Sequence, residues 1–229
     1  MKSLSIVGLY FILIFFLCSC NTYNPRNDWN DANVFSSRGE YIRANKLYDK
    51  IIKEQPDNIP ALINRGVNKS MLNDYTGAIK DYLAILEYDS TNTLSLVNLG
   101  NNYKRLENYN KAIDCYTKAL KTKGSIKSDS LYIEFLETPF SKGSSPYNVR
   151  QYEIEFERGI SYLKSDKYKL AIADLEQPLK YNFEPVTSIC YIGEAYYNLN
   201  DTINARLYLE EASKYRDADS IDMLKKLNN

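Results

Sequence analysis

The chain of 229 residues contains no histidine. Its absence excludes Ser-His-Asp and Cys-His catalysis and every metal site that uses histidine ligands. The sequence also lacks a phosphate-binding loop, a nucleophile motif, and any cysteine or carboxylate cluster with metal-ligand spacing. We therefore expect no enzyme activity, no metal and no cofactor.

Glycine and proline are scarce, at 9 and 7 residues. Because both interrupt helices, their scarcity favours long helices. Lys plus Arg and Asp plus Glu number 29 each, so the formal charge is zero. With no basic excess and no polybasic block, we expect neither nucleic acid nor an anionic bilayer surface as a partner. At 44% hydrophobic and 25% charged residues, the composition is that of a folded protein.

The amino terminus carries a long apolar run, residues 4–17, which follows the positive charge of Lys2. A helix that spans a bilayer needs about 20 apolar residues, so this run is too short to cross one. Its length and its flanking charge are typical of the apolar part of an export signal. A permanent anchor helix is the alternative.

A Leu-Cys-Ser-Cys sequence that ends at Cys20 resembles a bacterial lipobox, although Cys18 stands where a small residue is usual. The resemblance implies that residues 1–19 are removed and that Cys20 becomes the lipid-bearing first residue. Several acyl chains on one residue anchor a protein stably to a membrane. Asn21 is not the aspartate that retains lipoproteins at the inner membrane in some lineages. We expect an outer-membrane lipoprotein of the cell envelope that faces the periplasm, on a polar tether formed by residues 20–30.

The rest of the chain repeats itself every 34 residues, over 25–58, 59–92, 93–126, 152–185 and 186–219. Glycine or alanine recurs at the eighth place of each repeat, alanine at the twentieth, and tyrosine or leucine at the twenty-fourth. This pattern resembles the tetratricopeptide repeat, W-x2-L-G-x2-Y followed by A-x3-F and P. The resemblance implies an all-α fold, a right-handed α-solenoid of helix-turn-helix tetratricopeptide repeats.

Each recurring place has a physical explanation. The small residues at places eight and twenty lie where two helices cross, so a larger side chain would push the helices apart. The bulky residues at places four, seven, eleven and twenty-four share one helical face and fill the gap to the neighbouring repeat. The Asn, Asp or Gly residues before the tyrosine at place seventeen form the turn between the helices.

Three features depart from the pattern. Asp31 stands where leucine is usual and predicts a short or frayed first helix. Pro178 lies inside the second helix of the fourth repeat and predicts a kink or an early end. Residues 220–229 predict a closing helix that shields the end of the solenoid. Its expected inward residues are Ile221, Leu224 and Leu227, and its expected solvent-facing residues are Lys225 and Lys226.

The repeats fall into two groups, residues 31–126 and 150–219, separated by an insertion at 127–149. Residues 128–130 predict the cap of a short helix, and Pro146 predicts an unusually long first helix for the fourth repeat. The insertion is either a packed spacer or a flap over the binding groove.

Proteins of this family bind partners on the concave face, so the resemblance places a groove on the first helix of each repeat, at places two, five, six, nine, twelve and thirteen. We expect a protein or an extended peptide there, which makes the chain an interaction adaptor or assembly factor. The candidate lining residues are Trp29, Asn33, Asn64, Val67, Asn98, Asn101, Lys104, Arg105, Phe156, Glu157, Lys164, Tyr191, Glu194 and Tyr197.

The lining argues against the family's carboxylate clamp, which grips the carboxyl termini of chaperones. Trp29, Leu94 and Asn98 occupy the three places at which the clamp needs two lysines and an arginine. Asn64 and Asn98 share place six of consecutive repeats. These amides either hydrogen-bond the backbone of a bound peptide or bond locally and to solvent.

Charges in the groove also leave two interpretations open. Lys104 and Arg105 make its middle positive, and Glu157 and Glu194 make its later part negative. An ordinary solvated face is the alternative.

The aromatic residues divide into packing and groove positions. Those expected in the core are Tyr48, Tyr82, Tyr103, Tyr116, Tyr162 and Tyr196. Tyr191 and Tyr197 fall at groove places, where they support a second hypothesis. In that hypothesis the protein binds a glycan or small molecule in a pocket under residues 127–149.

Cys115 and Cys190 lie two repeats apart, too far for a disulfide. We expect both to be buried free thiols.

Overall fold

The computed structural model describes residues 25–126 and 148–227. The described part is almost entirely helical, with one pair of two-residue strands, β1 (Ser125–Ile126) and β2 (Val149–Arg150). The helices are α2 (Pro25–Ser37), α3 (Tyr41–Glu54), α4 (Ile59–Met71), α5 (Tyr75–Tyr88), α6 (Thr93–Arg105), α7 (Tyr109–Ala119), α9 (Gln151–Leu163), α10 (Tyr168–Lys180), α11 (Pro185–Asn198), α12 (Thr202–Ser213) and α13 (Ala218–Leu227).

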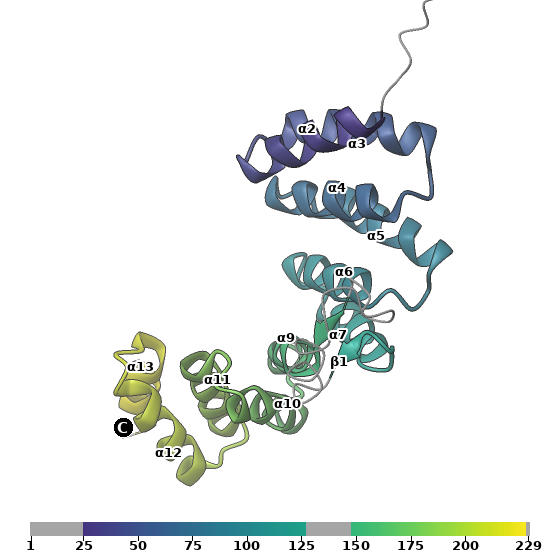
Figure 1. Ribbon diagram of the computed structural model, residues 1–229. Helices are drawn as coiled ribbons and strands as arrows, with labels where there is room; N and C mark the ends of the chain where they lie inside the picture. Colours follow the sequence, from purple (N-terminus) through teal and green to yellow (C-terminus); the bar gives the residue numbers. More distant parts are fainter. Residues whose placement is uncertain (1–24, 127–147, 228–229) are drawn as a thin grey trace, which may run out of the picture.

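The helices form five antiparallel pairs stacked into a curved array, followed by α13 (Figure 1). The first helices α4, α6, α9 and α11 lie along the inner side of the curve, and their partners α5, α7, α10 and α12 lie along the outer side (Figure 1). This arrangement confirms the predicted all-α helical repeat solenoid.

The turn inside each pair has the same backbone conformation. Place fifteen of every repeat has a positive φ, between 57° and 77°, which reverses the chain after the first helix. These residues are Gly39, Asn73, Glu107, Asp166 and Asn200. At the next place, side chains of Asp74, Asn108 and Asp201 accept a hydrogen bond from the backbone N–H three residues on, which caps the second helix.

The two helices of a pair cross at the eighth place of the repeat. A Cβ atom added to Gly100 would lie 2.6 Å from Cε1 of Tyr116, and one on Gly193 would lie 2.7 Å from Cδ2 of Leu209. Both distances are well below van der Waals contact, so only glycine permits this approach. The alanines at place twenty are fully buried, as the repeat pattern predicts: Ala44, Ala78, Ala112, Ala171 and Ala205.

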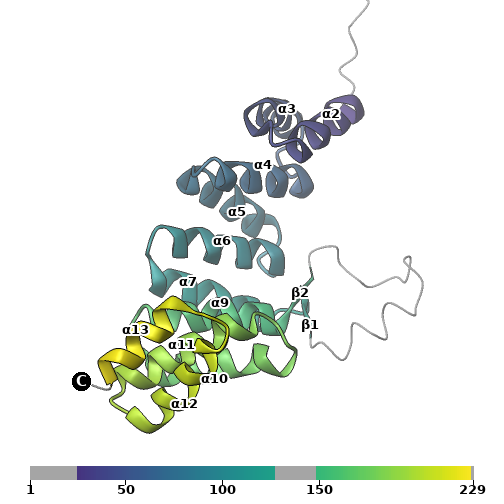
Figure 2. The same cartoon turned by 90° about the vertical axis from the view of Figure 1, so that its left-hand side faces the viewer.

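The hydrophobic core continues across the insertion. Ile154 on α9 is fully buried in one cluster with Leu96, Ala112 and Tyr116 of the third repeat. β1 and β2 pair in parallel, so the two ends of the insertion lie side by side at one edge of the solenoid (Figure 2). The hydrophobic core therefore continues from the third repeat into the fourth.

Residues 127–147 lie outside the described residues, and with them the helix expected after residues 128–130. The long first helix expected from Pro146 is wrong, because α9 begins at Gln151. The preceding residues are held in β2 by pairing with β1, which keeps them extended.

The first repeat is more regular than its sequence indicated. α2 spans 13 residues, as α4 and α6 do, so the prediction of a short helix from Asp31 is wrong. No repeat packs before α2 among the described residues, and the Asp31 side chain is exposed to solvent. The helix also includes residues 25–30, so the predicted tether over residues 20–30 is wrong for residues 25–30.

Pro178 lies within α10, which continues for two more residues and ends at Lys180. The side chain is buried at place twenty-seven, where the other repeats carry buried isoleucine or alanine. The proline has no N–H to donate to the carbonyl of Asp174, and only Leu179 and Lys180 follow it in the helix, so the interruption affects the last turn alone.

The closing helix is the first half of another repeat. Asp217 accepts a hydrogen bond from the backbone N–H of Ser220 at 2.8 Å, as Asn58 and Asn92 do at the starts of α4 and α6. Eight residues after this cap stands Lys225, where α4 and α6 carry glycine. A lysine there is larger than the glycines that permit the close helix crossing in α4 and α6.

The faces of α13 agree with the prediction except at one residue. Lys225 and Lys226 are exposed, and Leu224 and Leu227 are half-buried. Ile221 is 37% exposed, so its predicted inward position is wrong.

Two buried ion pairs occur at the same places of two repeats, and in each the two residues are sixteen apart in sequence. Arg65 donates to both carboxylate oxygens of Asp81, at 3.0 and 2.6 Å, and also to Asp49 of the preceding repeat at 2.7 Å. Arg158 makes the same bidentate contact with Asp174, at 2.6 and 2.8 Å. Each arginine stands at place seven and each aspartate at place twenty-three of its repeat.

In the third repeat the same two places carry buried Leu99 and Cys115. Burial raises the pKa of Asp174, and the guanidinium of Arg158 only partly offsets that shift. The polar pairs and the apolar pair therefore fill the same space, and the ion pairs are not required for packing.

We predict that Asp174→Ala lowers the free energy of unfolding by about 3 kcal/mol, because it leaves the guanidinium of Arg158 without its carboxylate partner. The double substitution Arg158→Leu with Asp174→Cys copies Leu99 and Cys115 of the third repeat and stays within about 1 kcal/mol of the parent chain. Urea unfolding followed by circular dichroism measures both. A double variant as unstable as Asp174→Ala would show that the ion pair itself stabilises the array.

Candidate functional site

The inner face of the solenoid brings most of the predicted groove residues together on the first helices. Val67, Arg105 and Lys164 are exposed there. The half-buried members are Trp29, Asn33, Asn64, Asn98, Asn101, Lys104, Glu157, Tyr191, Glu194 and Tyr197.

Phe156 is the exception, and its assignment to the groove is wrong. The side chain is only 7% exposed and packs against Leu163 and Leu175 in the core of the fourth repeat. Phe183 covers it edge-on, with ring centroids 5.4 Å apart. Positive φ values at Asn182 and Glu184 fold the α10–α11 link so that Phe183 reaches back to α9.

Amides in the first two repeats are held by a hydrogen-bonded network. Tyr48 donates its hydroxyl to Oδ1 of Asn33 at 2.6 Å, and Nδ2 of Asn64 donates to both groups, at 3.1 and 3.2 Å. In the third repeat Tyr116 donates to Oδ1 of Asn101 at 2.7 Å. These contacts fix the orientation of the amides and agree with local bonding of the groove asparagines.

The inner places of α4 carry no charge. They hold Pro60, Ile63, Asn64, Val67, Ser70 and Met71. Val67 is 39% exposed and Met71 is 59% exposed, so apolar side chains lie open beside the amide of Asn64. Trp29 extends this surface into the first repeat, edge-on to Tyr48 with ring centroids 5.9 Å apart.

Charges in the later groove are paired with one another across repeat boundaries. Lys104 of the third repeat contacts Glu157 of the fourth. Lys164 of the fourth repeat pairs with Glu194 of the fifth at 3.3 Å and lies over the ring of Tyr191. The predicted division into a positive middle and a negative end is therefore largely neutralised.

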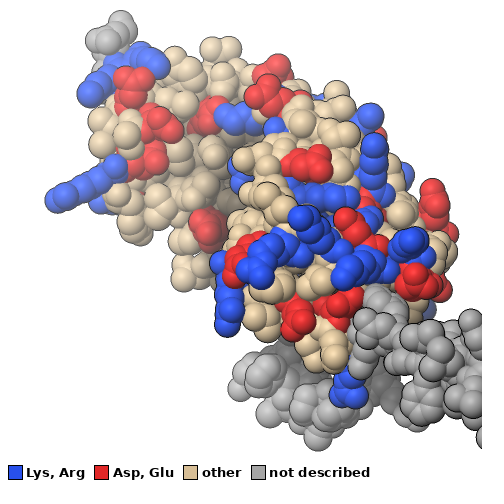
Figure 3. All heavy atoms as spheres, turned by 90° about the horizontal axis from the view of Figure 1, so that it is seen from above, with Lys and Arg blue, Asp and Glu red and all other residues tan. Residues whose placement is uncertain are grey.

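The surface around the first repeat shows the same balance of charge. Seen from above the array, Lys and Arg side chains alternate with Asp and Glu (Figure 3). This face carries no large field of one sign, in keeping with the formal charge of zero.

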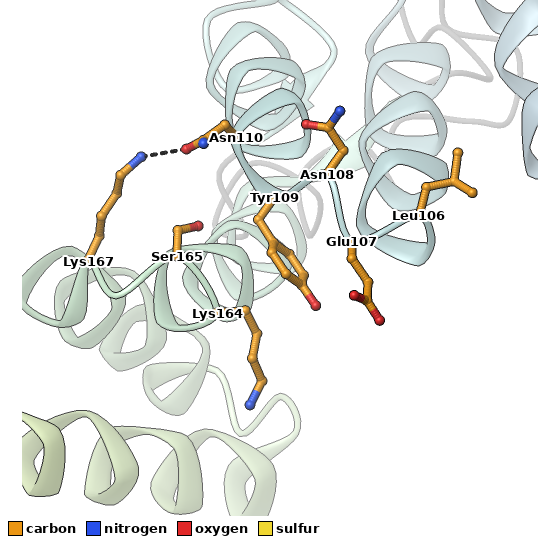
Figure 4. A pocket seen from close by; sticks show the side chains of 8 residues that line it. All are labelled: Leu106, Glu107, Asn108, Tyr109, Asn110, Lys164, Ser165 and Lys167. Atoms are coloured by element: carbon orange, nitrogen blue, oxygen red, sulfur yellow. Dashed lines mark hydrogen bonds between the residues drawn. The ribbon is translucent and has the colours of Figure 1, made fainter.

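A cavity of about 520 Å3 lies between the turns of the third and fourth repeats (Figure 4). It is lined by Leu106, Glu107, Asn108, Tyr109, Asn110, Lys164, Ser165 and Lys167. Lys164 follows the carboxyl end of α9, whereas the insertion joins its amino end through Arg150. The cavity is thus one helix length away from Arg150, and the pocket expected under residues 127–149 stays a prediction, because residues 127–147 lie outside the described residues.

Cys20 and the sequence around it lie outside the described residues, so the lipid site stays a prediction. In residues 25–126 and 148–227 no helix is long and apolar enough to cross a membrane. The same ranges contain no cluster of ligands for a metal ion.

Cys115 and Cys190 are both buried and free, as predicted. The thiol of Cys190 donates to Oδ2 of Asp217 at 3.2 Å, which links α11 to the cap of α13. Burial raises the pKa of Cys115 to about 11 and that of Cys190 to about 12. Burial also raises the pKa of Tyr48 and that of Tyr116.

Residues 94–124 match the sequence model of the tetratricopeptide repeat. This match, together with the solved structures below, supports the tetratricopeptide-repeat family for the array. A comparison with curated protein sequences finds no match.

Several solved structures share the fold at low sequence identity. YrrB, described as a TPR protein with an unusual peptide-binding site, superposes with a TM-score of 0.68 at 18% identity and covers 90% of this chain and 94% of its own. A MamA protein gives 0.67 at 17% identity, over 83% and 90%. PilW, described as a type IV pilus biogenesis factor, gives 0.62 at 16% identity, over 89% and 84%.

Sequence reasoning missed three features of these repeats. The Arg–Asp pairs were visible as Arg and Asp at the same two places of two repeats. The aromatic residues Tyr181 and Phe183 in the α10–α11 link were the sequence feature that could have indicated the burial of Phe156. The cavity had a signal in Lys167, which stands where the other repeats carry Glu, Asp or Asn.

We predict that stability falls as the pH rises from 9 toward 11. The unfolded chain releases the thiol protons near the ordinary pKa of 9.0, whereas the folded chain holds them to about 11 at Cys115 and about 12 at Cys190. The unfolded state therefore binds fewer protons in this window, and the free energy of unfolding decreases with pH. Buried Tyr48 and Tyr116 add to the fall from the same cause.

Urea unfolding at several pH values measures this dependence. Cys115→Ala combined with Cys190→Ala should flatten the slope between pH 9 and 10, where the thiols dominate. Stability that is constant or rises over this window would contradict the burial of these groups.

Proposed function

We propose that the protein is a membrane-anchored adaptor that binds an extended segment of a partner protein along the inner face of its repeats. The observation that carries this proposal is the uncharged inner surface around α4. There the exposed apolar side chains of Val67 and Met71 lie beside the oriented amides of Asn64 and Asn33. Such a surface suits a peptide whose contacting side chains are uncharged, because a buried charge would find no partner there.

The amides also suit a peptide backbone. Nδ2 of Asn64 donates to Asn33 and Tyr48, and Oδ1 of Asn101 accepts from Tyr116. The other amide atoms, Oδ1 of Asn64 and Nδ2 of Asn101, have no hydrogen-bond partner in the described part of the chain. An acceptor and a donor fixed in this way match the N–H and C=O groups of an extended chain. Pre-oriented side chains lose little entropy on binding.

The solved relatives agree with a binding role. YrrB is described as having a peptide-binding site, and PilW is described as a biogenesis factor. At 18% and 16% identity these similarities support the fold. A binding role for this chain is part of the proposal.

The anchor in the proposal is a lipid on Cys20, which holds the protein at the outer membrane with the groove in the periplasm. Four residues separate Cys20 from α2, which begins at Pro25. A chain extends at most about 3.6 Å per residue, so the first repeat lies within roughly 20 Å of the membrane surface. The partner is therefore a protein at or near that membrane, because anchoring raises the local concentration of the groove there.

We predict that Val67→Asp reduces recovery of the partner by about tenfold or more, since it buries an unpaired charge in an apolar contact. Affinity capture from solubilised membranes followed by mass spectrometry measures the recovery. Leu83→Asp is the matched control, because Leu83 is 43% exposed and lies on the outer helix α5.

Both substitutions add one negative charge at a similarly exposed aliphatic residue. Leu83→Asp should retain the partner captured by the parent chain. Equal recovery with the two variants would place the binding surface elsewhere than the inner face.

We predict that Cys20→Ser abolishes lipid attachment and leaves the export signal uncut by the lipoprotein peptidase. Metabolic labelling with a fatty-acid analogue and the mass of the purified chain measure the two effects. A Cys20→Ser chain that still runs at the mature mass and carries lipid would refute the anchor.

A further inference from the structure

The cavity between the third and fourth repeats differs from the groove in its chemistry. Two lysines line it, Lys164 and Lys167, against a single acidic residue, Glu107. The other polar groups of the lining are the amides of Asn108 and Asn110 and the hydroxyls of Tyr109 and Ser165. In Figure 4 these side chains come from two turns that face one another across the opening.

Two residues of the fourth repeat explain why the opening exists. Ser165 stands at place fourteen, where the second, third and fifth repeats carry leucine. The smaller side chain leaves space next to Tyr109. Lys167 stands at place sixteen, where the other repeats carry Glu40, Asp74, Asn108 and Asp201. The repeat pattern is therefore broken twice, and both changes face the same cavity.

Lys167 gives up a stabilising role at this place. Asp74, Asn108 and Asp201 each cap the following helix, whereas Lys167 makes no capping hydrogen bond. An N-cap residue contributes about 1 kcal/mol to stability, so a lysine here costs the fold something. Its ammonium group instead reaches across the cavity to Oδ1 of Asn110, at 2.9 Å (Figure 4).

The lysines have donors to spare. Each ammonium group carries three N–H donors and no acceptor. Lys167 uses one on Asn110, and Lys164 pairs with Glu194 at 3.3 Å. A group that accepts several hydrogen bonds and carries negative charge complements this lining best.

We propose that the cavity binds an acidic side chain of the partner, with the carboxylate at the ammonium group of Lys167, because Lys164 points away from it (Figure 4) and is paired with Glu194. The inference rests on the proposed adaptor function and extends it, because Lys164 also belongs to the inner face and so connects the two surfaces. The partner segment thus has an uncharged part, which lies on α4, and an acidic residue further along, which enters the cavity.

The test uses the full chain purified in detergent and two blocked peptides of equal length, tetraglutamate and tetraglutamine. Titration is followed by the NMR signals of the backbone amides at residues 106–110 and 164–167. Tetraglutamate should shift these signals in a saturable way, and tetraglutamine should not. Raising the salt concentration should weaken the binding, because the lysines are solvent-accessible.

Three single substitutions, each borrowed from another repeat, separate the cavity from general surface charge. Lys167→Asn introduces the residue found at Asn108, restores a helix cap, and should weaken tetraglutamate binding by about tenfold. Lys164→Asn introduces the residue found at Asn198 and should weaken binding less than Lys167→Asn does, because Lys164 is already paired with Glu194. Lys169→Asn introduces the residue found at Asn110, removes a nearby exposed lysine that does not line the cavity, and should leave binding within about twofold.

Equal losses with Lys167→Asn and Lys169→Asn would overturn the proposal in favour of diffuse surface charge. Equal binding of tetraglutamine would overturn it in favour of a neutral polar ligand, and the absence of any saturable shift would overturn it outright. The peptide probes report on the cavity alone, so this outcome is independent of the Val67→Asp capture. Loss of capture with Val67→Asp while tetraglutamate still binds would leave both proposals standing, whereas unchanged capture would remove only the adaptor groove.

Discussion

The close crossing of the two helices in each repeat is the contact on which the rest of the structure depends. A glycine or alanine at the eighth place accepts the side chain of tyrosine or leucine at the twenty-fourth, and Gly100 leaves no room even for a Cβ beside Tyr116. This approach fixes the distance and angle between the helices. With the second helices held on the outer side, the first helices line the inner side, and their places six, nine and thirteen become the exposed surface of a groove. The groove is therefore a consequence of the packing, and its chemistry is decided by residues that packing leaves free.

Those free residues divide the inner surface into two chemical regions. Around α4 the surface is apolar and amide-bearing, with Val67 and Met71 exposed. From the end of α6 onward it is charged, but Lys104 with Glu157 and Lys164 with Glu194 satisfy one another across repeat boundaries. Such pairs contribute little to stability when exposed, but they remove the charges from competition for a partner. The cavity beside Lys167 is where positive charge remains available, which is why an acidic residue of a partner is assigned to it.

Much of the fold was predictable from the sequence because its determinants are local and recur every 34 residues. The alanines at place twenty and the tyrosines Tyr48, Tyr82 and Tyr116 were expected in the core and are buried there. The errors arose where a residue's environment depends on a distant part of the chain. Asp31 does not shorten α2, because no described repeat precedes α2 and the Asp31 side chain faces solvent. Phe156 does not line the groove, because Phe183 covers it. The cavity was missed because a turn residue such as Lys167 was compared with the helix pattern and not with the same place of the other repeats.

A photo-reactive cross-linking residue placed at position 67 or at position 83 tests the central claim most directly, since the two side chains are 39% and 43% exposed on opposite sides of the array. Irradiation of intact cells followed by mass spectrometry identifies what each position touches. The account predicts that position 67 captures one protein in a defined adduct and that position 83 does not. Capture of the same protein from position 83 with none from position 67 would show that the outer side of the solenoid, and not the inner groove, holds the partner.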